Sequence, residues 1–317
     1  MIDLFPFSGF PVAVFGLSAE GIASARALML SGAEVIAWDE DPERRAAAAA
    51  QDIALRDLSA IDWREPVSLV IEHAIAHDKD GSHAIVSAAR AAGCEVIADV
   101  ELLGRAQRDA AYVALVSRNA AASALDLFEH VLQVSGRETE VGGDDGRPLA
   151  DLHGLDSGGV YVVSMPPARA DLTVSITFDA AVVLDLGSGA WPPCGSREST
   201  LAACRWVFHR QTGPKGAVIS VDSAAGRKIY QDLAANNEQV VIPVSGYARA
   251  PGGVYVVDGV LFDDIGGNAD AVTDLPLDSA QDAQITGLHA ASAYATAVLL
   301  DIPRHAAMAS LRSYFIE

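Results

Sequence analysis

The chain has 317 residues, of which 50% are apolar and 6% aromatic, and it carries 42 acidic against 22 basic side chains. This length suffices for two domains, each with its own core, and a composition rich in Ala, Val, Leu and Gly favours an α/β fold. The formal net charge of -20 repels phosphate backbones and anionic membrane surfaces, so we expect neither nucleic acid nor a membrane as a partner.

The first predicted unit, residues 12–41, combines a strand, a tight turn, a helix and a second strand. An apolar run at 12–15 ends at Gly16, an Ala- and Leu-rich segment follows, and a second apolar run at 35–38 closes on Asp39. The turn matches GxGxxG imperfectly, as Gly16-Leu17-Ser18-Ala19-Glu20-Gly21. A carboxylate about twenty residues beyond a glycine turn is typical of a doubly wound nucleotide-binding domain.

Further strands and helices alternate up to residue 108. Pro42 suits a first helical turn, Gly93 suits a helix end, and Asp99 suits a helix cap. The expected elements are helices at 42–50, 84–92 and 100–108 and strands at 68–71 and 95–98. We therefore expect a Rossmann-like first domain at residues 1–108.

A second α/β alternation is predicted for residues 109–317. The expected strands lie at 112–116, 160–164, 176–178, 181–185, 217–221, 240–243, 254–257 and 260–262. The expected helices lie at 120–134, 198–209, within 224–235, and at 289–300 and 304–315. Asp258-Gly259 predicts a tight hairpin turn, and the glycines and paired prolines of 187–196 predict a loop.

Cysteine usage and the N-terminus indicate the compartment. Cys94, Cys194 and Cys204 are widely spaced, form no CxxC pattern and fit reduced thiols. The N-terminus has no basic region and carries Asp3, unlike a signal peptide, and no apolar run reaches the ~18 residues that a membrane span needs. We expect a soluble cytoplasmic protein.

Several segments, taken in order, resemble the Mur ligases, and among them the branch that adds D-glutamate (MurD). The segments are VAVFGLSAEGIASARALMLSGAEVIAWDEDPER at 12–44, ARAAGCEVIADVELL at 89–103, YVALVSRNAAAS at 112–123, GGDDG at 142–146, YVVSMPPARADL at 161–172, GLHAASAYATAV at 287–298 and SLRSYFIE at 310–317. The resemblance implies a UDP-sugar-binding first domain and a Mur-ligase-central-like second domain. It covers two of the family's three domains, so we expect the C-terminal ligase domain to be absent.

The resemblance also implies a binding site in the first domain. Its glycine turn would face the diphosphate of a UDP-sugar, and the acids after the second strand would face the nucleoside. The residues implied are Gly16, Ser18, Ala19, Glu20 and Gly21 at the turn and Asp39, Glu40 and Asp41 after the strand. Free N–H groups at a helix N-terminus favour an anion, but Glu20 crowds the turn with negative charge. Alternatively, Glu20 complements the helix dipole of an empty site. The family's Ser-Pro-Gly turn reads Glu72-His73-Ala74 here, which argues against an intact pocket.

The second-domain positions that carry the family's chemistry are replaced. The phosphate cradle, GTNGKS/T in the family, falls at 117–123, where Ala121 stands for the lysine, Ala120 for a glycine, and Arg118 projects from a different position. The family's metal-ligating glutamate corresponds to Ser164 here, and its run with a metal-site histidine corresponds to residues 189–194. The lysine that the family carbamylates falls near Cys204, and the family's His-Asn pair reads His289-Ala290 here. Phosphoryl transfer needs a cradle, a cation and Mg²⁺. We therefore predict a degenerate P-loop, lost ATP and Mg²⁺ binding, no catalytic residue and no metal ligand.

Other candidate sites have structural interpretations that we favour. Segment 72–83 gathers His73, His77, Asp78, Asp80 and His83, and a solvated loop is favoured over a divalent-cation site. Cys204 and His209 lie five residues apart on a predicted helix, so they point apart and a core cysteine is favoured. Ser188 lies in GSG and not in the GxSxG of a nucleophile elbow. Trp191 is favoured as a packed loop anchor over an exposed platform for a partner.

The leading hypothesis is a MurD-like pseudoenzyme with a binding or regulatory role linked to peptidoglycan precursor metabolism. Its candidate partners are a UDP-sugar precursor and a cell-wall or division protein. One alternative is a divergent ATP-dependent ligase that needs a separate C-terminal domain. A further alternative is a nucleotide-dependent oxidoreductase, for which the second domain supplies no recognisable hydride-transfer site.

Overall fold

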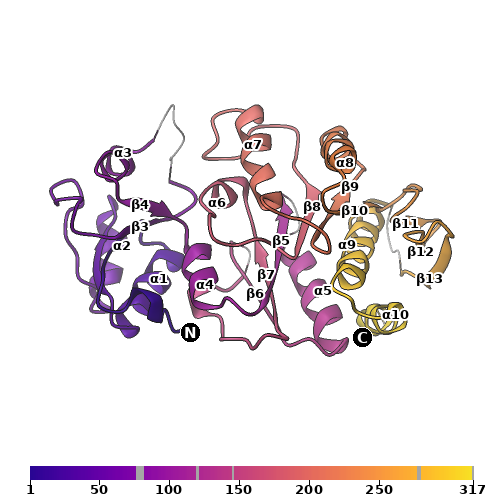
Figure 1. Cartoon of the computed structure of the whole chain (residues 1–317), viewed down its shortest axis with the longest axis horizontal. Coiled ribbons are helices and arrows are strands. Elements are labelled where there is room, and N and C mark those ends of the chain that lie inside the picture. Colours follow the sequence, from indigo (N-terminus) through magenta and orange to yellow (C-terminus); the bar gives the residue numbers. More distant parts are fainter. Residues whose placement is uncertain (76–81, 119–120, 145, 277–279, 316–317) are drawn as a thin grey trace.

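The computed structural model describes residues 1–75, 82–118, 121–144, 146–276 and 280–315 as two sheets flanked by helices (Figure 1). The strands are β1 Pro11–Phe15, β2 Glu34–Trp38, β3 Ser68–Ile71, β4 Glu95–Ile97, β5 Ala111–Ser117, β6 Thr139–Gly142, β7 Val160–Ser164, β8 Ala180–Asp185, β9 Gly216–Ser220, β10 Val240–Ser245, β11 Val254–Val257, β12 Val260–Asp263 and β13 Asp270–Asp274. The α-helices are α1 Ala19–Leu30, α2 Pro42–Ala49, α3 Ala84–Ala91, α4 Asp99–Ala106, α5 Ala121–Val134, α6 Pro167–Asp171, α7 Arg197–Cys204, α8 Ala224–Asn236, α9 Ala280–Leu299 and α10 Arg304–Tyr314. Three short 3₁₀ helices are η1 Phe5–Phe7, η2 Leu149–Asp151 and η3 Arg205–Phe208.

The first sheet is parallel, with strand order β2-β1-β3-β4. The last residues of β1, β2 and β3 pair in register, Phe15 with Trp38 on one side and with Ile71 on the other. The residues that follow these strands therefore meet at one edge of the sheet. They are Gly16, Asp39 and Glu72. In a doubly wound fold this edge is where ligands bind.

The second sheet has nine strands in the order β13-β12-β11-β10-β9-β8-β5-β7-β6. In this order, each neighbouring pair from β11 to β6, with β5 among them, is parallel. At the other end, β12 and β13 add an antiparallel edge. The predicted hairpin turn is confirmed, because β11 pairs antiparallel with β12 and both Asp258 and Gly259 have left-handed φ, of 50° and 79°. Asp258-Gly259 thus fixes the register of this edge.

Two apolar cores divide the second sheet by face. Alternate residues of β5 belong to different cores: Val113 and Leu115 pack with α5, α9 and α10, whereas Ala114 and Val116 join a core that continues into the first domain. This alternation is the period of two that a strand imposes. Since one core runs from the first sheet to a face of the second, the two sheets are packed as one body along its length.

The predicted α/β class is confirmed, and most predicted elements lie within a few residues of observed ones. The strand predicted at 176–178 is wrong. Glu101 of α4 accepts the backbone N–H groups of Val174 and Ser175 at 2.7 and 2.8 Å. The backbone just before 176–178 is therefore bonded to a side chain of α4, and no strand forms at 176–178. The prediction also missed β6 and β13, which are short and carry acidic residues. The division at residue 108 stays a prediction.

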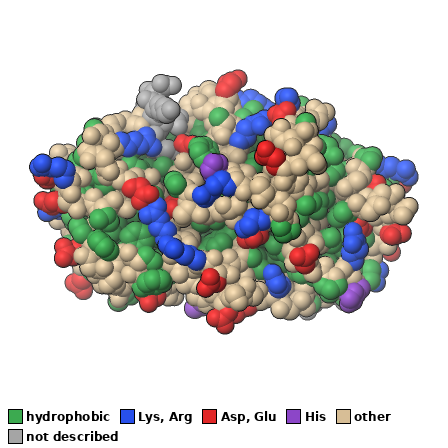
Figure 2. All heavy atoms as spheres, in the orientation of Figure 1, with side chains coloured by type: hydrophobic (Ala, Val, Ile, Leu, Met, Phe, Trp, Pro, Cys, Tyr) green, Lys and Arg blue, Asp and Glu red, His purple; other side chains and the backbone are tan. Residues whose placement is uncertain are grey.

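The surface and the helices agree with the composition. Figure 2 shows acidic and basic side chains interspersed over the face it draws, between patches of apolar atoms. Within the part of the chain that the structure describes, no helix is both long enough and apolar enough for a membrane crossing.

Candidate functional site

The glycine turn lies between β1 and α1 at the edge where three parallel strands end. Gly16 has a φ of +96°, which favours glycine, and Ser18 is the N-cap residue of α1. Gly21 packs directly on the turn, because a Cβ at this position would lie 1.9 Å from the carbonyl oxygen of Gly16. The sequence pattern thus forms the close turn–helix packing that the motif predicts.

Carboxylates of the chain itself occupy the N–H groups of this turn. The Leu17 N–H donates to Asp39 Oδ2 at 2.7 Å, and the Ser18 N–H donates to Glu72 Oε1 at 2.5 Å. Arg44 lies beside both acids, with Nη1 3.4 Å from Asp39 Oδ2 and 3.6 Å from Glu72 Oε2. Two donors that would otherwise receive an anion are therefore used internally.

The three acids after β2 have different partners. Asp39 is buried and also accepts the Asp41 N–H at 2.8 Å, whereas Asp41 caps α2 by accepting the Glu43 N–H at 2.8 Å. Glu40 is exposed and lies 3.1 Å from His83 Nε2. Of the acids predicted to face a nucleoside, Asp39 and Asp41 thus hold the β2–α2 connection, whereas Glu40 pairs with the N-cap residue of α3.

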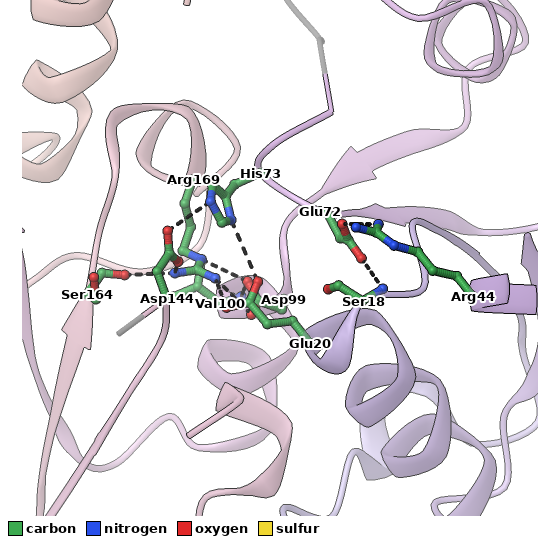
Figure 3. A network of polar contacts seen from close by, with 10 residues as sticks. All are labelled: Ser18, Glu20, Arg44, Glu72, His73, Asp99, Val100, Asp144, Ser164 and Arg169. Atoms are coloured by element: carbon green, nitrogen blue, oxygen red, sulfur yellow. Dashed lines mark hydrogen bonds and ion pairs between the residues drawn. The ribbon is translucent and has the colours of Figure 1, made fainter. Parts of the chain in front are cut away.

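Arg169 of α6 gathers acids from both halves of the chain (Figure 3). Its side chain is fully buried; Nη2 donates to Glu20 at 3.0 Å, Nε to Asp99 at 3.0 Å, and Nη1 to both Asp144 and the Ser164 carbonyl oxygen, the latter at 2.9 Å. Glu20 therefore turns away from the glycine turn and towards the second sheet. Sequence reasoning missed Arg169, whose only signal was an arginine in an otherwise apolar stretch.

His73 completes this Arg169 cluster, which we define as Glu20, His73, Asp99, Asp144 and Arg169. Its Nε2 lies 2.8 Å from Asp144 Oδ2, and its Nδ1 lies 3.7 Å from Glu20 Oε2. Potential metal-ligand atoms of Glu20, His73 and Asp144 lie within 4.8 Å of one another. The guanidinium already pairs with both carboxylates, so the cluster is a salt-bridge network between the two halves.

Burial and charge act in opposite directions on the pKa values of the cluster. Burial raises the pKa of Glu20, although Arg169 opposes it. Burial would also raise the pKa of Asp144, but Arg169 and His73 lower it overall. Burial disfavours the charged form of Arg169, yet its three carboxylates raise its pKa and keep it ionised.

Two cavities open at the carboxyl ends of the sheets. One of about 180 Å³ lies at the first sheet and is lined by Phe15, Asp39, Glu40, Arg44, Glu72 and His83 among others. The other, of about 280 Å³, lies at the second sheet between β8, β9 and α9; its lining includes Asp185, Asp222, Ser223, Tyr247, Leu288 and His289. No lysine or arginine belongs to the described lining of the second cavity.

The chain is 33% identical to a UDP-N-acetylmuramoylalanine–D-glutamate ligase of Phenylobacterium zucineum and to one of Caulobacter vibrioides, over 99% of this chain and 68% of each relative. The chain belongs to this ligase family. No model of a protein family matches it.

Solved structures of other Mur ligases share the fold of this D-glutamate ligase family member. The Neisseria meningitides UDP-N-acetylmuramate:L-alanyl-gamma-D-glutamyl-meso-diaminopimelate ligase matches with a TM-score of 0.61 at 13% identity, covering 95% of this chain and 97% of that one. The Thermotoga maritima UDP-N-acetylmuramate-alanine ligase matches with a TM-score of 0.53 at 13% identity, covering 96% and 68%. At this identity the likeness establishes the fold.

Two of the second-domain positions where the resemblance implies replaced residues or motifs, Ser117 and His289, line the second cavity. Ala121 is buried at the start of α5, while Asn119 and Ala120 lie outside the described residues. Arg118 is turned to the 189–191 loop: Nη1 donates to the Ala190 carbonyl oxygen at 2.9 Å, and the guanidinium lies 5.7 Å from the Trp191 ring centre. Trp191 itself packs against the apolar core that continues into the first domain.

The remaining candidates that the structure describes lie in a core or pair with acids. Cys204 is fully buried, and burial raises its pKa to about 12, so it is a core thiol. Of the segment 72–83, His73 joins the Arg169 cluster and His83 pairs with Glu40, while His77, Asp78 and Asp80 lie outside the described residues. His73 and His83 therefore have different partners.

Proposed function

We propose that this D-glutamate ligase family member does not carry out ATP-dependent ligation and has a binding or regulatory role linked to peptidoglycan precursor metabolism. The link rests on its relatives, which are named as ligases of UDP-N-acetylmuramoylalanine and D-glutamate. The loss of ligation rests on this chain's own residues. Family membership alone would favour the ligase, so the proposal depends on these residues.

Ala121 is the observation that carries the proposal. Phosphoryl transfer depends on positive charge that neutralises the developing charge on phosphate oxygens. Ala121 offers only a methyl group at the position where the resemblance implies a lysine, and it is buried. The neighbouring cation, Arg118, donates to the Ala190 carbonyl oxygen and lies over Trp191.

The cavity at the second sheet supports the same proposal. Its described lining contains two acids, Asp185 and Asp222, and no lysine or arginine. Asp222 accepts the Ser245 hydroxyl at 2.5 Å and the Gly246 N–H at 2.9 Å, so its carboxylate is fixed in place. Burial lowers the pKa of His289 to about 4, so this lining imidazole is neutral at pH 7. A polyphosphate would meet net negative charge in this cavity.

The residues at the implied Mg²⁺ positions do not fit that ion. Mg²⁺ prefers oxygen ligands in octahedral geometry, commonly carboxylates. Ser164 is buried, and its carbonyl oxygen accepts from Arg169 at 2.9 Å. Cys204 offers a buried thiol whose pKa is raised to about 12. Neither position supplies a carboxylate or a carbamylated lysine.

The experiment measures phosphate release by the full chain with ATP, Mg²⁺, UDP-N-acetylmuramoyl-alanine and D-glutamate. We expect release at the level of the reaction without D-glutamate, while the Caulobacter vibrioides relative, assayed in parallel, gives substrate-dependent release. Release by this chain that requires all three substrates would overturn the proposal. Release only after adding the relative's separately produced C-terminal region would establish the divergent-ligase alternative.

That the turn and the acids after β2 face a UDP-sugar stays a prediction, and the occupied Leu17 and Ser18 N–H groups count against it. The predicted residues are Gly16, Ser18, Ala19, Glu20 and Gly21 at the turn and Asp39, Glu40 and Asp41 after the strand. Thermal-shift measurements with UDP-N-acetylmuramoyl-alanine, UDP, ATP with Mg²⁺, and NAD test this proposal. A ligand at 100 times its dissociation constant stabilises by about 2.7 kcal/mol, and no shift with UDP-N-acetylmuramoyl-alanine or UDP would reject the predicted UDP-sugar binding.

A further inference from the structure

Glu72 places a carboxylate at the glycine turn where a helix N-terminus would otherwise receive an external anion. It follows directly on β3, whose last residue pairs in register with the last residue of β1, so its side chain reaches across to the turn. Glu72 Oε1 accepts the Ser18 N–H at 2.5 Å, and the adjacent Leu17 N–H is occupied by Asp39. The two N–H donors therefore both hold carboxylates from neighbouring strand ends.

The side chain of Glu72 also fills the space. A Cβ at Gly16 would lie 2.7 Å from the Glu72 Cδ, so the side chain packs against the bare backbone of the turn. The hollow left behind it, between Gly16, Gly21, Glu72 and Asp99, measures only about 10 Å³. This volume is at the lower limit for one water molecule and cannot take a phosphate.

The charges reinforce this exclusion. The Glu72 and Asp39 side chains are only 9% and 10% exposed, and they share a single arginine, Arg44, whose side chain is 47% exposed. One partly solvated cation faces two buried anions, so the turn keeps a net negative charge. Either carboxylate would repel an approaching diphosphate, and the repulsion is stronger where water is excluded.

We propose that Glu72 is the residue that closes the first-sheet site to phosphate: its carboxylate acts as an internal anion on the Ser18 N–H. The adjoining cavity of about 180 Å³ then accepts only ligands that bring no phosphate to the turn. Removal of this one carboxylate opens the turn to a nucleoside diphosphate. The inference goes beyond the proposed loss of ligation and is independent of it, because it concerns the other sheet and a binding step.

The test compares UDP and uridine binding by isothermal titration calorimetry in the full chain and three variants. Glu72→Ser removes both the charge and the bulk, Glu72→Gln removes only the charge, and Glu65→Gln is the control, because Glu65 pairs with Arg56 at the surface. We expect Glu72→Ser to bind UDP at least about tenfold more tightly than the wild type, with Glu72→Gln between them. Uridine, which carries no phosphate, should bind all four proteins equally.

Three results would overturn the inference. They are wild-type binding of UDP as tight as that of Glu72→Ser, no gain in either Glu72 variant, or an equal gain for uridine. Circular dichroism shows whether each variant is folded, and the near-isosteric Glu72→Gln keeps the test decisive if Glu72→Ser does not fold. Phosphate release is measured separately, so failure of the ligation proposal and failure of this inference are distinguishable.

Discussion

Replacing Arg169 by methionine tests whether the Arg169 cluster holds the two halves of the chain together. The arginine side chain is fully buried and pairs with Glu20, Asp99 and Asp144, whose side chains are 18%, 10% and 26% exposed. Methionine has similar length but no charge, so three largely buried carboxylates lose their counter-ion. Breaking a buried ion pair from one side costs about 3–5 kcal/mol. Because His73 remains beside two of the acids and each acid keeps some solvent contact, we expect about 3 kcal/mol.

The pH dependence of the stability of Arg169→Met provides a second, independent test of this prediction. Without the guanidinium, burial raises the folded-state pKa values of Glu20 and Asp144 above their unfolded values. The folded variant then binds protons more tightly than its unfolded state, so its stability rises as pH falls. The destabilisation relative to wild type should therefore be smaller at pH 5 than at pH 7.

Urea unfolding at both pH values, followed by far-UV circular dichroism and by tryptophan fluorescence, measures the effect. The control is Arg64→Met, because Arg64 pairs with Asp62 at the surface and its side chain is 81% exposed; no measurable change is expected. A free energy of unfolding for Arg169→Met equal to that of wild type would refute the role of the cluster. A loss of equal size at pH 5 and pH 7 would refute the electrostatic reason for it.

Two further predictions concern the second cavity and the glycine turn. Burial lowers the pKa of His289 to about 4, so the unfolded chain takes up this proton first as pH falls below about 6.5; the contribution to stability is present above that pH and is lost towards pH 4. His289→Gln should therefore lose stability less steeply than wild type over this range, by up to about 1.4 kcal/mol per pH unit. Urea unfolding across this range measures the difference, and equal losses for His289→Gln and wild type would contradict the assignment. Gly21→Ala would place a Cβ 1.9 Å from the Gly16 carbonyl oxygen and should destabilise the fold by at least about 1–3 kcal/mol in urea unfolding. Gly158→Ala, where a Cβ meets open space, is its control, and equal stability of the two variants would show that the turn–helix packing is not tight.

The class of fold and most elements follow from the sequence because they depend on local patterns. Apolar runs ending in glycine or acidic residues locate β1 and β2, and Asp258-Gly259 specifies its hairpin because both residues tolerate left-handed φ. The strand wrongly predicted at 176–178 shows the limit. Its apolar pattern is that of a strand, but the two preceding N–H groups bond to Glu101, which lies more than seventy residues earlier in the chain.

The arrangement of the candidate site depended on the tertiary structure. The sequence placed the glycine turn, the acids at 39–41 and Glu72 each after a strand, and it identified Glu72 as a departure from the family turn. Only the strand order β2-β1-β3 brings Asp39 and Glu72 to either side of that turn and sets their carboxylates on its N–H groups. Likewise, no local pattern relates Arg169 to Glu20, because their contact joins a helix of each sheet across 149 positions. Periodicity and turn chemistry act between near neighbours in the chain, whereas buried charges select their partners by proximity in the folded protein.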